Sequence, residues 1–202
     1  MKLHEVFNLI VSTSYKKTGI DVDYCVKEVE GIPCLLFKES NSKIDWKTNF
    51  HFWKKPYKNQ ENTMLVHSGF ANAWKSANDV IMKEFIDLVN KKKATKVLIT
   101  GWSFGGAMSY FAAEDFNYRT GLKPDVITFG APKIVAPFAF KSRKHIASAI
   151  NNLQNVTHKA DIVTKIPPFF IKFKRLSVGK FSLKLFFTGK GHTLYGEESL
   201  YK

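Results

Sequence analysis

The sequence predicts an α/β fold: a single domain over residues 1–202, with a central, mostly parallel sheet flanked by helices. Two short apolar runs, at 96–100 (KVLIT) and 125–129 (DVITF), are typical of strands buried on both faces. The segment 104–115 between them has an Ala-rich, helical composition, so helix and strand alternate along the chain. A chain of 202 residues can bury one sizeable core but is cramped for two full domains.

The other elements are predicted from the spacing of apolar residues and from turn residues. The clearest is a helix at 71–93, in which large apolar residues recur every three or four positions. The polar stretch 39–62 is long for a connector, and long loops are often functional. The aromatic and basic stretch 169–188 is predicted to be a hairpin or a strand–loop–strand unit. The remaining expectations are a helix built on Leu3, Val6, Phe7, Ile10 and Val11, strands at 24–29 and 32–38 joined by a Gly turn, a helix at 141–153 and a strand at 155–158.

The chain is strongly basic, since 31 Lys and Arg against 17 Asp and Glu give a formal charge of +14. Such a charge favours an anionic partner, either nucleic acid or a membrane with acidic lipid, although a solvated Lys-rich surface explains it equally well. No basic motif with nucleic-acid spacing is present, so no nucleic-acid partner is expected. No stretch approaches 18 uninterrupted apolar residues, so no membrane span is predicted. The sequence does not determine the oligomeric state.

The cysteines and the N-terminus bear on the cellular compartment. Cys25 and Cys34 flank the predicted Gly turn and could face each other across a hairpin. Two cysteines cannot support a disulfide-rich secreted scaffold, so reduced thiols are expected. Polar residues interrupt the apolar run at the N-terminus, and no small-residue cleavage site follows it. We therefore expect no signal peptide and favour an intracellular location.

The sharpest motif is GWSFGG at 101–106, which follows the 96–100 strand and opens the next helix. A serine hydroxyl is a poor nucleophile unless it is exposed and has a base beside it. A sharp strand-to-helix turn provides the exposure at Ser103, and the glycines two positions before and after it leave room for that turn. The new helix also directs its first N–H groups toward a developing oxyanion. We predict that Ser103 is a nucleophile; the alternative is a Gly-rich turn without chemistry.

A nucleophilic serine needs a base, and three histidines follow Ser103 in the sequence. His145 lies in a predicted helix among Lys and Arg, and His158 ends a predicted inner strand, so both are interpreted as structural. His192 lies in a Gly-Lys-Gly-His loop near the C-terminus, from which an imidazole can reach the strand ends. We predict that His192 is the base.

The carboxylate that orients the base is predicted to be Asp161. It follows a strand and precedes an Ile-Pro-Pro turn, which places it at the strand's C-terminal end, where ligands of open α/β sheets collect. Its role would be to hold the imidazole in the correct tautomer and to stabilise the imidazolium. The rivals are Asp115, inside the helix after Ser103, and Asp125, at the wrong end of a strand. The alternative role for Asp161 is turn formation.

Taken together, these residues resemble the class 3 lipase family, the fungal-type triacylglycerol lipases of the α/β-hydrolase superfamily with their plant and viral relatives. The similar stretches run in family order from residue 37 to residue 195, which is more specific than the GxSxG pattern alone. They are FKESNSKIDW (37–46), VHSGFANAW (66–74), VLITGWSFGGAMS (97–109), VITFGAPK (126–133), HKADIVTKIPP (158–168) and GHTLY (191–195).

The resemblance implies that Ser103, Asp161 and His192 form a catalytic triad. It also implies an oxyanion hole, which residue spacing alone does not indicate. Ser40 would supply a backbone N–H and a hydroxyl, and the N–H of Phe104 would be the second donor. In family lipases a mobile lid follows the first donor, which corresponds here to about residues 41–52.

The chain departs from the family pattern at two places. The family's Arg-Gly pair before the first oxyanion donor is Lys38-Glu39 here. A carboxylate that faced the site would oppose the developing negative charge, so Glu39 is expected to point away or to pair with a lysine such as Lys38. The family's His before the serine is Trp102, which is expected to line the acyl pocket.

The expected function is hydrolysis of lipid esters, as a lipase, an esterase or a phospholipase, through an acyl-enzyme and without a metal or an organic cofactor. The stretch 169–188 lies in sequence between Asp161 and His192, so it could border the active site and contact an anionic membrane. A half-buried hairpin is the alternative. A catalytically weak lipase-like module that binds anionic membrane surfaces remains a competing hypothesis, and Glu39 is the residue that supports it. A nucleic-acid-binding protein is supported by net charge alone.

Overall fold

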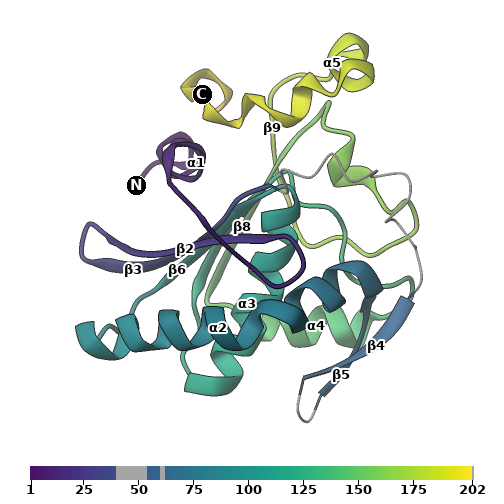
Figure 1. The fold of residues 1–202 in the computed structure, drawn as a ribbon. Coiled ribbons are helices and arrows are strands. Elements are labelled where there is room, and N and C mark those ends of the chain that lie inside the picture. The colour runs from purple at the N-terminus through teal and green to yellow at the C-terminus, as the bar shows by residue number, and fades with distance from the viewer. Residues whose placement is uncertain (40–53, 60–61, 202) are drawn as a thin grey trace.

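The computed structural model describes residues 1–39, 54–59 and 62–201 (Figure 1). The described strands form a seven-stranded sheet, in the order β1-β2-β3-β6-β7-β8-β9, and a separate two-stranded sheet of β4 and β5. Their bounds are β1 (Lys16–Thr18), β2 (Val22–Val29), β3 (Ile32–Phe37), β4 (Lys54–Asn59), β5 (Asn62–His67), β6 (Leu98–Trp102), β7 (Asp125–Phe129), β8 (Asn152–His158) and β9 (Leu176–Val178).

The large sheet is antiparallel at one edge, where β1, β2 and β3 pair, and parallel from β3 through β6, β7 and β8 to β9. The parallel strands bring their C-terminal ends to one edge of the sheet, which is where open α/β sheets bind their ligands. The predicted central, mostly parallel sheet is confirmed.

The β2–β3 hairpin turns at Glu30 and Gly31, which both have positive φ. Its register pairs Cys25 with Leu36 and Cys34 with Lys27, so the two cysteines are not opposite each other. Both are free, and burial raises the pKa of Cys34 to about 12, which keeps that thiol protonated.

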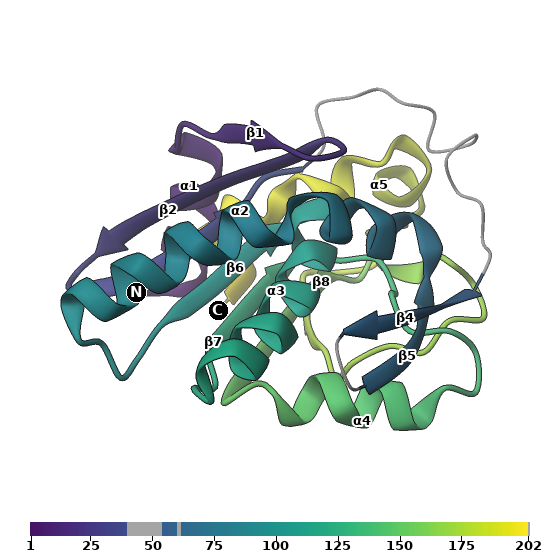
Figure 2. The ribbon, with the colours of Figure 1, turned by 60° about the horizontal axis from the view of Figure 1, so that its bottom comes forward.

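Helices cover both faces of the large sheet (Figures 1 and 2). Helices α2, α3 and α4 pack on one face, and α1 with the short C-terminal turns η3 and η4 packs on the other. The α-helices are α1 (Leu3–Ser12), α2 (Ser68–Lys92), α3 (Phe104–Thr120), α4 (Phe140–Ser148) and α5 (Leu183–Thr188), and the 3₁₀ turns are η1 (Val163–Lys165), η2 (Lys190–His192), η3 (Leu194–Gly196) and η4 (Glu198–Tyr201).

Two clusters of buried side chains result. The large cluster lies between the sheet and helices α2, α3 and α4, and includes Trp74, Phe85 and Phe116. The small cluster lies on the α1 side of the sheet, because α1 turns Val6, Phe7 and Ile10 inward, as its apolar spacing predicts. The small cluster consists of Val6, Phe7, Ile10, Cys34, Leu36, Leu98, Trp102, Phe129, Val156, Val178 and Tyr195.

Two predicted regions need correction. The described part of 39–62 is not a structureless connector, because β4 pairs with β5 in an antiparallel hairpin. The stretch 169–188 is neither a hairpin nor a strand–loop–strand unit: it contains one short parallel strand, β9, followed by helix α5. Helix α4 also ends at Ser148, earlier than expected. None of the helices in the described ranges has both the length and the apolar character needed to cross a membrane.

Candidate active site

Ser103 occupies the turn between β6 and α3. Its φ of 57° and ψ of −121° are unusual for a residue with a Cβ, and its N–H donates a hydrogen bond to the Phe129 carbonyl at 2.9 Å. Gly105 permits the tight approach of α3 to β3, since a Cβ there would lie 2.5 Å from the Phe37 carbonyl oxygen. The predicted strand–turn–helix context of the GxSxG motif is therefore present.

Asp161 and His192 form a hydrogen-bonded pair at the same edge of the sheet. Asp161 follows β8 and is fully buried, and His192 ends the turn η2. Nδ1 of His192 and Oδ2 of Asp161 are 2.8 Å apart, while Oδ1 of Asp161 accepts a hydrogen bond from the Val163 N–H at 2.9 Å. The carboxylate is thus held from its own loop and from the histidine loop.

The backbone of β7 connects this pair to Ser103. Gly130 follows Phe129, whose carbonyl accepts the Ser103 N–H. A Cβ at Gly130 would lie 2.8 Å from both Oδ2 of Asp161 and Nδ1 of His192, and its φ of +58° also favours glycine. Nε2 of His192 is buried and has no hydrogen-bond partner in the described part of the chain, so the structure contains the His–Asp contact but not the Ser–His hydrogen bond.

Trp102 contacts the loop that carries His192 through a hydrogen bond and a ring contact. Its Nε1 donates to the His192 carbonyl at 3.0 Å, and its ring lies 5.4 Å from the His192 ring between centroids. The other face of Trp102 packs in the small cluster, with Phe7 at 5.3 Å. These contacts hold His192 in position; that Trp102 also lines an acyl pocket stays a prediction.

Tyr195 is a site residue that sequence reasoning missed. Its hydroxyl donates to Oδ2 of Asp161 at 2.5 Å and accepts the His158 N–H at 2.9 Å. Burial and the neighbouring Asp161 raise the pKa of Tyr195 well above its usual value, so the hydroxyl keeps its proton and can donate. The signal was available, because Tyr195 follows His192 by three residues and so lies one helical turn away.

Of the two predicted oxyanion donors, Phe104 lies in the described part of the chain and Ser40 does not. Phe104 begins α3, and the first N–H of this region to bond within the helix is that of Gly106, to the Ser103 carbonyl. The N–H of Phe104 is therefore one of the groups that a helix N-terminus leaves available. Ser40 and the expected lid at 41–52 lie outside the described residues.

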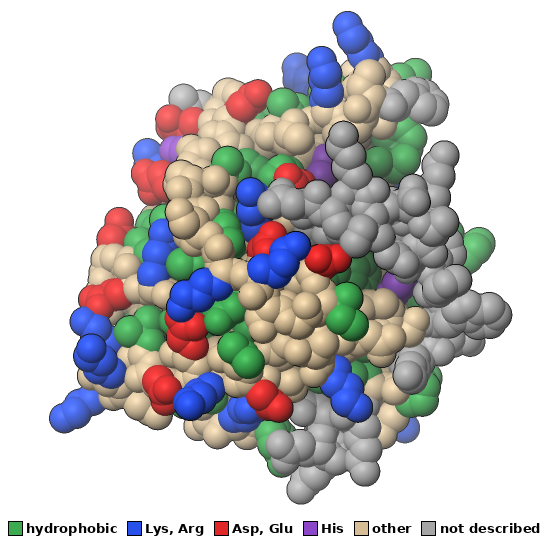
Figure 3. All heavy atoms as spheres, in the orientation of Figure 1, with side chains coloured by type: hydrophobic (Ala, Val, Ile, Leu, Met, Phe, Trp, Pro, Cys, Tyr) green, Lys and Arg blue, Asp and Glu red, His purple; other side chains and the backbone are tan. Residues whose placement is uncertain are grey.

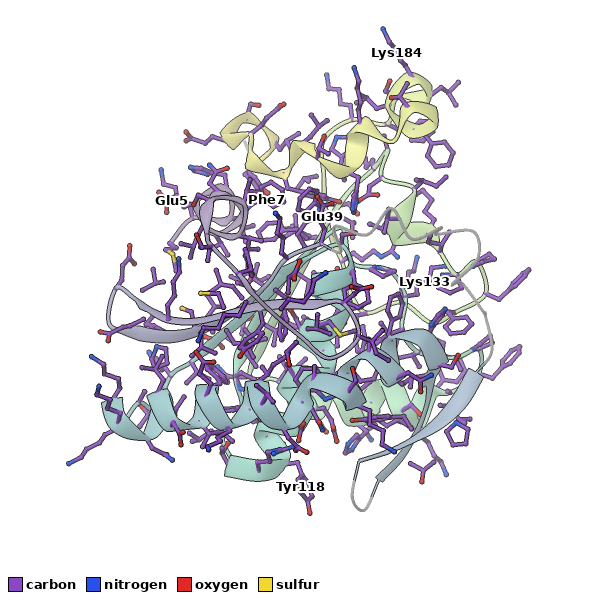
Figure 4. The ribbon with its side chains drawn as sticks, viewed as in Figure 1. Glu5, Phe7, Glu39, Tyr118, Lys133 and Lys184 are labelled. Atoms are coloured by element: carbon purple, nitrogen blue, oxygen red, sulfur yellow. The ribbon has the colours of Figure 1, made fainter. Side chains whose placement is uncertain are left out.

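Glu39 follows β3 at the strand-end edge of the sheet (Figure 4). It is half-buried, and this burial raises the pKa of its carboxyl, while the electrostatic influence of His192 and then of Lys38 lowers it. Glu39 is thus close enough to His192 and to Lys38 to be influenced electrostatically by both, and whether its side chain pairs with Lys38 or points away stays a prediction. No group of His, Cys, Asp and Glu in the described ranges is arranged to hold a metal ion.

Comparison with known proteins places this geometry in a family. A family model described as lipase (class 3) matches residues 34–171, more than half of the chain. The chain belongs to the class 3 lipase family. The family predicted from the sequence motifs is therefore confirmed.

Individual relatives of this class 3 lipase chain are fungal. Lipase A of Sodiomyces alcalophilus is 30% identical over 113 residues, which cover 51% of this chain and 27% of the relative. Secreted mono- and diacylglycerol lipase 1 of Fusarium solani is 27% identical over 161 residues, covering 80% of this chain and 47% of the relative. The chain thus spans less than half the length of these relatives.

Solved structures confirm the predicted α/β-hydrolase fold. The Rhizomucor miehei lipase–propeptide complex, as a deletion mutant, matches with a TM-score of 0.71 at 23% identity, over 83% of this chain and 55% of that one. A triacylglycerol lipase whose catalytic centre is described as a serine protease triad matches with a TM-score of 0.69 at 23% identity, over 82% of this chain and 64% of that one.

Proposed function

We propose that this class 3 lipase chain hydrolyses lipid esters, with Ser103 as nucleophile, His192 as base and Asp161 as the carboxylate that orients the base. The observation that carries the proposal is the buried 2.8 Å contact between His192 and Asp161 at the sheet edge that holds the Ser103 turn. A serine, an imidazole and a carboxylate in this arrangement are suited to acyl transfer.

The first step forms an acyl-enzyme. Oγ of Ser103 attacks the ester carbonyl carbon while Nε2 of His192 takes the serine proton. Asp161 holds Nδ1 of the imidazole and stabilises the imidazolium. The N–H of Phe104 stabilises the oxyanion from the start of α3, and Ser40 is proposed as the second donor. His192 then returns the proton to the leaving alcohol.

The second step releases the acid. Water replaces the alcohol, His192 takes a proton from it, and the resulting hydroxide attacks the acyl carbonyl; the proton then returns to Ser103 as the C–O bond to the serine breaks. The imidazole alternates between base and acid, so no metal or organic cofactor enters the proposal. The unpaired Nε2 of His192 suits this cycle, since catalytic hydrogen bonds in unliganded enzymes often form only with substrate.

Labelling with a fluorophosphonate tests the nucleophile. The wild-type chain should take one covalent label on Ser103, and Ser103→Ala should take none and lose on the order of 10⁴-fold or more in turnover of a short nitrophenyl ester. Ser148→Ala is the matched control, because Ser148 is an exposed serine at the end of α4 and should change neither result. Full activity of Ser103→Ala would refute the proposal.

The substrate class within lipid esters is also a proposal. The relatives are named as lipases of acylglycerols, and peripheral contact with an anionic membrane would extend the choice to phospholipid. Turnover of tri-, di- and monoacylglycerols, phospholipids and nitrophenyl esters of increasing length separates lipase, phospholipase and esterase. The intracellular location remains a prediction; the Fusarium solani relative is named as secreted, and fractionation of producing cells decides the matter for this chain.

A second candidate is a lipase-like module that binds anionic membranes and has little activity. Glu39 favours it, because a half-buried carboxylate beside the base disfavours negative charge developing on the substrate. Vesicle binding by a chain that neither takes the fluorophosphonate label nor hydrolyses any of these esters would select this candidate. Restoration of labelling by Glu39→Gly, which gives the family's residue, would identify Glu39 as the cause.

A further inference from the structure

We propose that Phe138, Phe169, Lys165 and Lys172 form a fixed docking surface for an anionic lipid membrane beside the active site. We call these four residues the aromatic–basic ledge. The inference deepens the proposed action on lipid esters, since a protein held at a lipid surface meets its substrate there. It can still be tested by binding alone, without any turnover.

The ledge joins two loops that are tied together. Val135 and Ile171 form an antiparallel bridge, with the Ile171 N–H bonded to the Val135 carbonyl at 2.9 Å. Nζ of Lys133 donates to the carbonyls of Pro167 and Pro168 at 3.0 and 2.8 Å. Phe138 lies three residues beyond one side of the bridge and Phe169 two residues before the other. Both rings therefore lie within three residues of the point where the two loops pair.

The exposure of these aromatic side chains is exceptional for their size. Phe138 is 88% exposed and Phe169 is 84% exposed, whereas the next aromatic residues in the second loop, Phe170 and Phe173, are buried. Phe173 stacks on Tyr110 with ring centroids 4.5 Å apart, which fixes which side of the loop faces outward. Exposed apolar side chains grouped within a polar rim mark interaction sites, because exposure of that much apolar surface to water is unfavourable.

The cations of the ledge flank Phe169 in the second loop, which follows Asp161 in the sequence. Lys165 ends the turn η1, four residues after Asp161, and Lys172 follows Phe169 by three residues. Both side chains are exposed, and neither forms an ion pair within the described chain. Burial lowers the pKa of Lys133, and the neighbouring Arg175, Lys172 and Lys165 lower it further, as expected where cations gather.

The sequence around the ledge has almost no negative charge to offset these lysines. Residues 126–196 contain twelve Lys and Arg but a single acidic residue, Asp161, which is fully buried against His192. Residues 1–125 contain eighteen Lys and Arg and fourteen Asp and Glu. Figure 3 shows the mixed charge over α2 at the lower left and lysines beside hydrophobic side chains at the top, where Figure 1 places α5. Figure 4 shows Lys184 of α5 pointing outward there.

The pairing of exposed rings with lysines favours a membrane over a nucleic acid. Lysines near an acidic membrane surface are attracted to its headgroups, and aromatic rings insert at the headgroup level. A nucleic acid would use the lysines in the same way, but the two exposed rings would gain little without splayed bases to stack on. Loss of binding on removal of the rings therefore distinguishes the membrane from general charge attraction.

The test is flotation of the full chain with vesicles, in the Ser103→Ala background so that the lipid stays intact. Phosphatidylcholine vesicles containing phosphatidylserine should bind about tenfold or more tightly than phosphatidylcholine alone, and raised salt should weaken this binding. Phe138→Ser/Phe169→Ser and Lys165→Glu/Lys172→Glu should each lower the affinity about tenfold or more. Because all four side chains are exposed, thermal unfolding should confirm that both variants fold.

Matched controls lie on α2 and at its C-terminal cap, Lys93, outside the two loops of the ledge. Lys91→Glu/Lys93→Glu changes the net charge equally, and Val80→Ser removes an exposed apolar side chain; both should keep the affinity within about twofold of the parent. Equal loss in the α2 lysine variant, or RNA binding that is as tight and ignores the Phe pair, would overturn the ledge. Vesicle binding by the ledge, together with a wild-type chain that takes no fluorophosphonate label on Ser103, would refute the proposed hydrolase and leave the ledge standing.

Discussion

The two hydrophobic clusters lie on opposite faces of the same sheet and differ in what they contact. The large cluster packs α2, α3 and α4 and lies beneath the helix that begins at Ser103. The small cluster includes Trp102 and Tyr195, which hydrogen-bond to His192 and Asp161 respectively. Ser103 thus lies at the start of a helix that packs in the large cluster. His192 and Asp161 are instead held by hydrogen bonds from residues of the small cluster, on the other face of the sheet.

This division means that general stability and alignment of the site rest on different side chains. A change in the large cluster should lower the stability of the whole fold and leave the His–Asp contact intact in molecules that remain folded. A change in the small cluster should also displace the histidine loop. Gly130 lies where the two layers meet, since its backbone follows the Ser103 acceptor and packs against the His–Asp pair.

Outside the triad itself, the largest effect on activity is expected for Gly130→Ala. The new Cβ would lie 2.8 Å from Asp161 Oδ2 and from the His192 ring, and the positive φ adds strain. Separation of the pair should reduce turnover of a short ester on the order of 10³-fold or more. Gly121→Ala is the control, because it has a similar φ of +73° but nothing within 4 Å. Equal losses in the two variants would show that strain alone matters.

The clusters can be compared directly through one phenylalanine from each. Phe85 is buried in the large cluster against Phe116, and Phe7 is buried in the small cluster against Trp102 and Tyr195. Either Phe→Ala change should lower the free energy of unfolding by about 3–5 kcal/mol, measured with urea. Well below the unfolding midpoint, Phe85→Ala should retain wild-type kcat and Phe7→Ala should lose about tenfold, because Trp102 and Tyr195 lose their packing. Unchanged kcat in both would contradict the division.

The large-cluster side also carries a pH dependence that the active site does not cause. His67 precedes α2, and its Nδ1 accepts the Gly69 N–H. Burial lowers the pKa of His67 to about 4. Between pH 6.5 and pH 4 the unfolded chain takes up a proton that the folded chain does not, so stability falls as the pH drops, by roughly 3 kcal/mol in total.

His67→Asn sharpens this prediction, since asparagine also caps helices but does not titrate. Urea unfolding at pH 7.5, 5.5 and 4.5 should show the wild-type chain losing stability relative to His67→Asn as the pH falls. A constant difference between the two proteins across this range would show that His67 titrates normally in the folded state.

The sequence predicts best where a feature depends on neighbouring residues. The β6 strand, the Ser103 turn and helix α3 follow from a buried run, two glycines and an Ala-rich segment, all within 25 residues. Asp161 and His192 could be chosen because one follows a predicted strand and the other lies in a later loop that can reach the strand ends. The stretch 169–188 misled because its mixture of aromatic and basic residues suggested a half-buried strand. In the structure Phe169 and Lys172 are exposed while Phe170 and Phe173 are buried, a three-residue spacing in a loop held by one bridge.

The sequence could not predict contacts between residues that are far apart along the chain. Trp102 lies at the end of a strand that is buried on both faces, so its face depends on which helix covers that side. The first helix of the chain covers it, through Phe7, which lies 95 residues before Trp102 in the sequence. Tyr195 packs against Phe7 of the same helix and reaches Asp161 with its hydroxyl, a contact that depends on this packing and not on neighbouring residues. For Glu39, the sequence indicated a conflict of charge but not its proximity to His192.

The smallest expected effect, from Tyr195→Phe, tests the small cluster most finely. The change removes the hydroxyl that donates to Asp161 and leaves the buried His158 N–H without its acceptor, which should cost about 1–3 kcal/mol of stability. Tyr201→Phe is the matched control, since its hydroxyl donates to the Tyr195 carbonyl at 2.8 Å in the same layer but does not reach Asp161. If Tyr195 positions the carboxylate, only Tyr195→Phe should lower kcat, by about tenfold with KM little changed, and the pH–rate profile should shift with it. Equal kcat in the two variants would limit Tyr195 to a structural role and leave Trp102 as the contact through which the small cluster holds the base.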